Sequence, residues 1–241
     1  MNLSDRQKEL LKAIVELHVK TGESVGSETL EKEYSLGVSP ATIRNEMVKL
    51  TEMGFLKQPH TSAGRVPTSM GYRVYIQDLM KEKELPVSAE VQIKHDMWQK
   101  RHQTNLLVKE AVRSLSTKLR MLALAVNEDD EVLFSGAYHI LDFPEFEDID
   151  VTRFVLSLFD ENPRLREIIG RALGPDPMHI LFGDELGMEQ LNPTSFVFCK
   201  FEGTGKGGII GVIGPARMNF PVILPYVRYT TNLIDQAIKS Y

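Results

Sequence analysis

Residues 39–47 read Ser-Pro-Ala-Thr-Ile-Arg-Asn-Glu-Met, and this stretch decides the fold of the first part of the chain. Ser39 can cap the N-terminus of a helix, and Pro40 suits the first helical position, where its missing N–H is no loss. Ile43, Met47 and Leu50 then recur at i, i+4 and i+7, which places them on one apolar stripe. We therefore predict a helix from Ser39 to about Met53 that packs through this stripe.

Two helices are predicted before this one. Ser4–Gln7 has the pattern of a capping box and opens a helix that Gly22 ends. A second, shorter helix runs from Gly26 to about Tyr34, and Gly37 suits a left-handed turn after it. Two helices joined by a glycine-containing turn are typical of a helix-turn-helix.

A hairpin is predicted to follow the third helix. Phe55–Gln58 reads as a strand, and Arg65-Val66 reads as its return strand. The residues between them, 59–64, are mostly small and polar, as in the tip of a wing. A further helix is expected over residues 71–84. Residues 1–84 are therefore predicted to form a winged helix-turn-helix domain.

The side chains off the apolar stripe are candidates for reading DNA. An arginine can bond guanine through two hydrogen bonds, an asparagine can do the same with adenine, and short side chains permit close approach. On the hairpin we expect polar and basic donors to contact phosphate or the minor groove. The alternative for any one of them is an ordinary solvated side chain. The candidate DNA-binding residues are Ser39, Ala41, Thr42, Arg44, Asn45, Lys49, Lys57, His60, Thr61, Ser62, Arg65 and Arg73.

The formal net charge of −5 argues against nucleic acid when the chain is taken as a whole. Its distribution removes the objection, because residues 1–84 hold twelve Lys or Arg and twelve Asp or Glu. Between Ser39 and Arg73 five basic residues face only two acidic ones, Glu46 and Glu52. DNA binding depends on local neutralisation of phosphates, so this segment is compatible with it.

The composition also indicates the cellular location of the protein. A single cysteine, Cys199, excludes an internal disulfide and favours a reducing, cytoplasmic location. The first residues do not resemble a signal peptide. No apolar run reaches the roughly 18 residues of a membrane span. We expect a cytoplasmic protein.

Residues 88–120 form the longest helical pattern, and shorter elements follow it. The predicted strands are 121–126, 131–139, 179–182, 195–201 and 208–213, and the predicted helices are 150–159, 162–173 and 220–238. This alternation predicts a mixed sheet covered by helices over residues 106–241, joined to the first domain by a connecting segment, 85–105. The fold class is α+β.

Several strings resemble one family. Ala-Thr-Ile-Arg-Asn at residues 41–45 and His-Thr-Ser-Ala-Gly-Arg at residues 60–65 are long and specific, and residues 71–75, 141–146 and 211–221 extend the match. The chain resembles the HrcA heat-inducible transcription repressors. The resemblance implies a dimer on an inverted-repeat DNA operator upstream of chaperone genes, and a GAF-like C-terminal domain with an inserted dimerisation domain. It also implies that the chaperonin GroEL maintains the active repressor.

The chain departs from this family pattern in length. The strand ending at Val126 leads almost directly into the next strand at Glu131, so the inserted dimerisation domain is expected to be missing. Helix 88–105 or an edge of the GAF-like sheet is then expected to hold the dimer together. The alternative function is a winged-helix regulator whose GAF-like domain senses a small molecule.

No enzymatic or cofactor-binding constellation emerges. Residues 203–208 satisfy G-x-G-x-x-G, but a strand is predicted after them, so they are read as a hairpin turn. His95 and His102 are too few to hold a metal. Arg217 is expected to form a structural salt bridge, with ligand contact as the alternative. We predict no enzyme, no cofactor and no metal.

Overall fold

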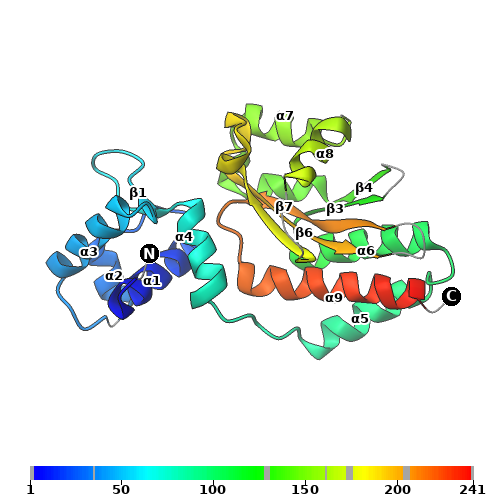
Figure 1. The fold of residues 1–241 in the computed structure, drawn as a ribbon, viewed down its shortest axis with the longest axis horizontal. Coiled ribbons are helices and arrows are strands. Elements are labelled where there is room, and N and C mark those ends of the chain that lie inside the picture. The colour runs from blue at the N-terminus through cyan, green and yellow to red at the C-terminus, as the bar shows by residue number, and fades with distance from the viewer. Residues whose placement is uncertain are drawn as a thin grey trace. The chain divides into compact units, whose positions relative to one another are not determined.

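The computed structural model describes residues 3–34, 36–127, 131–160, 162–171, 176–202 and 207–239. The chain divides into two compact units, Met1–Lys81 and Glu82–Tyr241 (Figure 1). The domain boundary expected from the sequence was residue 84.

The first unit opens with three helices, α1 (Asp5–Thr21), α2 (Ser27–Glu33) and α3 (Pro40–Glu52). Their termini follow the predicted chemistry. Ser4 and Gln7 form a reciprocal capping box, and Gly22 ends α1 in the left-handed conformation with φ 77°. The Ser39 hydroxyl accepts from the backbone N–H of Thr42. The predicted helix-turn-helix is confirmed.

The core of the first unit lies between α1 and α3. Ile43, Met47 and Leu50 of α3 are buried, as are Leu10 and Ile14 of α1. The predicted hairpin forms from β1 (Leu56–Lys57) and β2 (Val66–Pro67), which pair antiparallel. We call the hairpin segment 56–67 the wing.

The last helix of this unit is shorter than predicted. It consists of α4 (Ser69–Val74) and one π turn, η1 (Tyr75–Leu79), and it ends before Met80 rather than at Glu84. Beyond it the chain belongs to the second unit. There Glu82 pairs with both terminal nitrogens of Arg228, the nearer at 2.5 Å, and the Lys83 N–H donates to the Pro221 carbonyl at 2.8 Å. Both residues are exposed, and these bonds tie them to the rest of the second unit.

The second unit is a five-stranded sheet with helices on both faces (Figure 1). The strand order is β4-β3-β7-β6-β5, and every pairing is antiparallel, whereas the sequence suggested a mixed sheet. The strands are β3 (Leu122–Asn127), β4 (Val132–Ser135), β5 (Met178–Phe182), β6 (Thr194–Phe201) and β7 (Gly208–Pro215). The helices are α5 (Val87–Trp98), α6 (Thr104–Leu119), α7 (Ile149–Ser157), α8 (Asn162–Gly170) and α9 (Phe220–Lys239). Short 3₁₀ turns span Ala137–Asp142, Pro144–Phe146, Gly183–Leu186 and Glu189–Leu191.

The long helix expected over residues 88–120 is wrong. The chain reverses at the polar segment 99–103, which separates α5 from α6. Because it reverses, the apolar faces of the two helices can both be buried, as Ile93 of α5 and Ala111 and Leu115 of α6 are. A bond from Lys118 to Gln92 joins the two helices. Packing here overrides the continuous helical pattern.

The strand expected over residues 131–139 is also shorter. It ends at Ser135, because Gly136 turns the backbone with φ +71° and a Cβ there would lie 1.9 Å from the Ser116 hydroxyl. β3 and β4 form a short hairpin in which Val126 is opposite Val132. The turn expected at residues 127–130 lies mostly outside the described residues. In the described part of the chain no helix is both long and apolar enough to cross a membrane.

Candidate nucleic-acid interface

The outer face of α3 carries the predicted base-reading side chains. Ala41, Arg44 and Asn45 are exposed, while Thr42 is half-buried. The burial of Ile43, Met47 and Leu50 on the other face turns these residues outward. Ser39 is exposed, but its hydroxyl is engaged by Thr42 in the helix cap. The candidates that remain available are Ala41, Arg44 and Asn45.

The two cations of α3 differ in their surroundings. Lys49 donates to the Glu46 carboxylate at 2.8 Å, and this bond holds the pKa of Glu46 below its usual value. Gln7 of α1 donates to the same carboxylate at 3.1 Å. Arg44 has no hydrogen bond or ion pair with any residue that the structure describes. Its charge is therefore the less compensated of the two.

The wing is attached to the start of α2 through its backbone. Val25 and Arg65 exchange two N–H···O bonds, of 2.8 and 2.9 Å. These bonds form an isolated antiparallel bridge next to the β1–β2 hairpin. Gly64 makes this approach possible, because a Cβ there would lie 2.3 Å from the Val25 carbonyl oxygen. At the tip, the Gln58 amide donates to the carbonyls of Thr61 and Ala63 at 2.9 and 3.0 Å. Gln58 was not among the residues predicted from the sequence, and its position one residue beyond β1 was the available signal.

Arg65 contributes more than its backbone. Its Nε donates to the Thr51 hydroxyl of α3 at 3.1 Å, and Thr51 in turn donates to the Met47 carbonyl at 2.8 Å. The side chain is half-buried. Arg65 therefore ties the wing to the C-terminal half of α3, which leaves only part of its guanidinium for a phosphate.

A hollow of about 430 Å³ lies between α3, the wing and the start of α2. It brings together four of the predicted residues, namely Arg44, Thr61, Ser62 and Arg65. Lys57 and His60 are exposed on the wing outside it, and Arg73 lies half-buried on α4. Val48 also lines the hollow; it was not among the residues predicted from the sequence, although it follows Arg44 by one helical turn.

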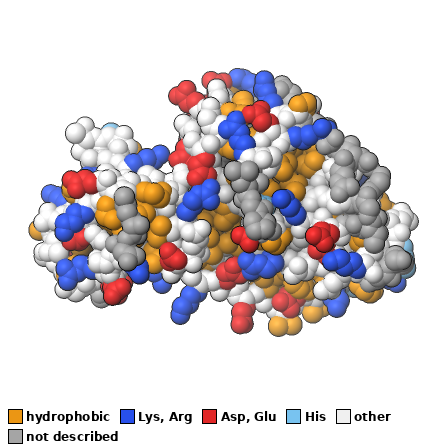
Figure 2. Space-filling view, in the orientation of Figure 1, with side chains coloured by type: hydrophobic (Ala, Val, Ile, Leu, Met, Phe, Trp, Pro, Cys, Tyr) orange, Lys and Arg blue, Asp and Glu red, His pale blue; other side chains and the backbone are white. Residues whose placement is uncertain are grey.

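Charge does not single out this region on the face of the molecule drawn in Figure 2. Basic and acidic side chains are interspersed there. No broad basic surface is visible on that face.

One face of the sheet in the second unit is closely packed. On one face of its sheet, large side chains such as Ile140, Phe146, Leu158 and Leu191 are buried against the strands in a continuous core. This packing gives no support to a small-molecule pocket on that face. Among the described residues, no cluster of three or more His, Cys, Asp or Glu could hold a metal.

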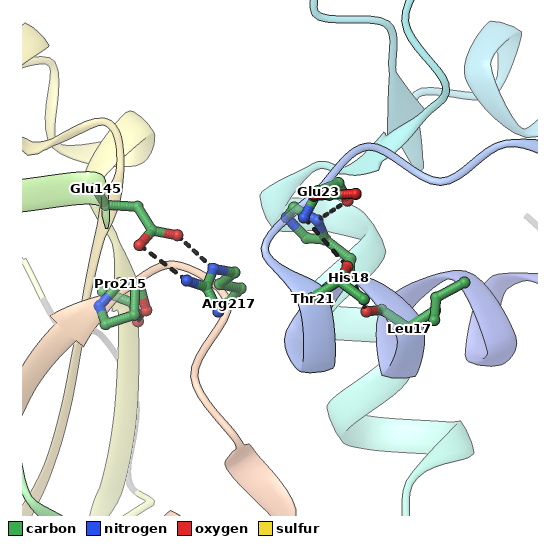
Figure 3. A network of polar contacts seen from close by, with 8 residues as sticks. Leu17, His18, Thr21, Glu23, Glu145, Pro215 and Arg217 are labelled. Atoms are coloured by element: carbon green, nitrogen blue, oxygen red, sulfur yellow. Dashed lines mark hydrogen bonds and ion pairs between the residues drawn. The ribbon is translucent and has the colours of Figure 1, made fainter. Parts of the chain in front are cut away.

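Two sequence features of the second unit are explained by its structure. The Arg217 guanidinium pairs with the Glu145 carboxylate through two bonds, of 2.5 and 3.1 Å, which confirms the predicted salt bridge (Figure 3). Residues 203–206 of the G-x-G-x-x-G string lie outside the described residues. On either side of them β6 and β7 pair antiparallel, so a strand and not a helix follows the string, as predicted.

Figure 3 also shows a polar network within the first unit, at the end of α1. His18 Nδ1 lies 2.7 Å from the Glu23 carbonyl oxygen, and the Thr21 hydroxyl donates to the Leu17 carbonyl at 2.9 Å. The Glu23 N–H donates to the same hydroxyl at 3.2 Å. These bonds fix the loop that leads from α1 to Val25, to which the wing is attached.

Two family models match the chain. Residues 2–80 match the winged helix-turn-helix transcription repressor model, HrcA DNA-binding, and residues 71–224 match the HrcA protein C-terminal domain. Together these matches span both structural units.

Curated relatives and a solved structure are also similar. A heat-inducible transcription repressor HrcA from Pelotomaculum thermopropionicum is 27% identical over 340 residues, covering 99% of this chain and 98% of that protein. One from Syntrophobacter fumaroxidans is 28% identical over 342 residues, with the same coverage. A crystal structure of a protein described as hypothetical matches with a TM-score of 0.78 at 16% identity over 99% of both chains, which supports the fold alone.

The lengths of these alignments bear on the expected missing domain. Both run about a hundred positions beyond the 241 residues of the chain. The relatives therefore carry residues that have no counterpart here, in agreement with the expectation that an inserted domain is missing.

Proposed function

This chain belongs to the HrcA family of transcription repressors, and from that premise we propose that it represses chaperone genes by binding an inverted-repeat operator as a homodimer. It is a DNA-binding repressor and not an enzyme. The observation that carries the proposal is the match of residues 2–80 to the family's DNA-binding model. Arg44 supports it, because it is exposed on the outer face of α3 and bonds none of the residues that the structure describes. Because the proposed target is chromosomal DNA, we place the protein in the cytoplasm.

The roles of the DNA-binding residues are part of this proposal. α3 enters the major groove, where Arg44 and Asn45 bond base edges and Ala41 allows close approach. Lys57 and the wing tip contact the phosphate backbone, which positions the protein without selecting sequence. The remaining candidates are Ser39 at the N-cap of α3, Thr42 and Lys49 on α3, and Arg73 on α4.

The outer face of α5 supports the homodimer. Val87, Val91 and Trp98 are 74%, 62% and 44% exposed, whereas Ile93 and Met97 on the opposite face are buried. Their spacing of four and then seven residues aligns the three exposed side chains along one stripe. An antiparallel copy of α5 would set Val87 against the partner's Trp98 and the partner's His95 close to Glu90. We therefore assign dimerisation to this stripe.

Val91→Glu is expected to convert the dimer to a monomer, because it places a charge at the centre of the stripe. Analytical ultracentrifugation measures the oligomeric state. Selection of binding sites from a pool of randomised DNA duplexes shows how many half-sites each protein recognises. Wild type should select two inverted half-sites about one helical turn, or a multiple of it, apart. The variant should select a single half-site.

Gln92→Glu is the matched control for Val91→Glu, because it adds the same charge one residue away, where Lys118 bonds Gln92. It should stay dimeric. If Val91→Glu stayed dimeric, the stripe on α5 would not be the interface, and we would assign the interface to the edge strand β4, where Phe134 is 51% exposed. A monomeric wild type that selects one unrepeated site would contradict the homodimer itself.

We also propose that the chaperonin GroEL maintains the active repressor. The second unit exposes large apolar side chains, such as Tyr138, Leu141 and Ile149 at 69%, 67% and 62%, and such surface favours aggregation after partial unfolding. Repressor heated with chaperonin and ATP is expected to keep more operator binding than repressor heated alone. Equal loss in both samples, measured by anisotropy of labelled operator, would contradict this partner.

A further inference from the structure

The outer face of α3 carries a branched apolar side chain, Val48, among polar ones. Val48 is 39% exposed, although its neighbours Met47 and Leu50 are buried. Valine is a weaker helix former than alanine, and a partly exposed side chain gains only part of the free energy of burial. Part of the Val48 side chain is therefore open to a binding partner.

The position of Val48 places it beside the proposed base readers. It follows Arg44 by four residues and Ala41 by seven, so the three side chains lie on one face of the helix. Val48 and Arg44 both line the hollow between α3 and the wing. Most other groups that reach the hollow from the wing are polar, such as Gln58, Thr61 and Ser62. Val48 therefore offers an exposed apolar contact from α3 on the side of the hollow that faces these polar groups.

The major groove of DNA presents one apolar group that fits such a contact. Thymine carries a C5-methyl group at the groove surface, and cytosine has hydrogen there. We propose that Val48 is a specificity-determining residue that contacts the methyl group of one thymine in each half-site. The proposal rests on the proposed function, because it requires α3 to lie in the major groove. It adds a base preference that hydrogen bonds from Arg44 and Asn45 do not supply.

Replacement of thymine by deoxyuridine tests this contact, because it removes the methyl group and leaves the hydrogen-bonding edge unchanged. The probe is the duplex that wild type selects from a randomised pool, with each thymine replaced in turn. Wild type is expected to lose about fourfold in affinity per half-site at one position, the value of one buried methyl group. Val48→Ala should lose about as much on the thymine duplex. On the deoxyuridine duplex it should lose nothing further.

Two outcomes would overturn the proposal. One is a wild type that tolerates deoxyuridine at every position. The other is a Val48→Ala penalty of equal size on the thymine and deoxyuridine duplexes, as expected if Val48 only packs against the wing. Met70→Ala is the matched control, since Met70 is 42% exposed on α4 and does not line the hollow; it should bind both duplexes as wild type does. If wild type selected no duplex at all, the proposed function would fail first, and the contact with it.

Discussion

Replacing Arg44 with alanine is expected to weaken operator binding by about 1–3 kcal/mol per half-site, while binding to random duplex stays nearly unchanged. The reason is geometric. Arg44 is exposed on the outer face of α3 and is bonded to none of the residues that the structure describes, so its guanidinium is available for two parallel hydrogen bonds to guanine. Removing them should relax the preference at one base pair. Fluorescence anisotropy on the selected operator and its single-base variants measures both effects.

The control for Arg44→Ala must remove a positive charge elsewhere in the same unit. Lys12→Ala does so on α1, where Lys12 lies 4.0 Å from Glu16. It should bind the operator as wild type does. If Arg44→Ala lost as much affinity for random duplex as for the operator, Arg44 would be a phosphate contact rather than a base reader.

Gly64→Ala is expected to lower operator affinity at least tenfold and to lower the melting temperature of the first unit. A Cβ at this position would lie 2.3 Å from the Val25 carbonyl oxygen and 2.9 Å from the Gly26 nitrogen. Both atoms are backbone, so no change of rotamer relieves the clash, and overpacking of this kind costs about 1–3 kcal/mol. The Val25–Arg65 bridge should open and carry the wing away from α3. Thermal melting by circular dichroism and anisotropy measure the two effects.

Gly26→Ala is the matched control for Gly64→Ala. Gly26 lines the same hollow, but a Cβ there would meet only the Thr29 hydroxyl, at 3.7 Å, which is ordinary contact. We expect a small loss of stability from the changed helix cap and near-normal operator binding. A Gly64→Ala protein with wild-type melting and affinity would show that the wing does not depend on this close approach.

The prediction from sequence succeeded where the signal is local. The capping residues correctly predicted the ends of α1 and α3. Ser39, Pro40 and Gly22 act on backbone N–H and C=O groups only a few residues away, so their effect can be recognised in the local sequence. It failed where distant packing decides. The reversal between α5 and α6 and the end of β4 at Ser135 depend on partners such as Ser116 that local periodicity does not reveal.

In the candidate site, too, some features follow from the local sequence and others depend on tertiary contacts. The sequence by itself determined the winged helix-turn-helix and the outward position of Arg44 and Asn45, since a helical period of 3.6 residues turns them away from Ile43 and Met47. Only the tertiary structure decided that Arg65 is bonded to Thr51 and that Gly64 meets Val25, because these contacts join segments separated along the chain. The tertiary structure likewise placed Val48 in the hollow. Helix periodicity is a property of neighbouring residues, whereas a wing is positioned by contacts that exist only once the domain has folded.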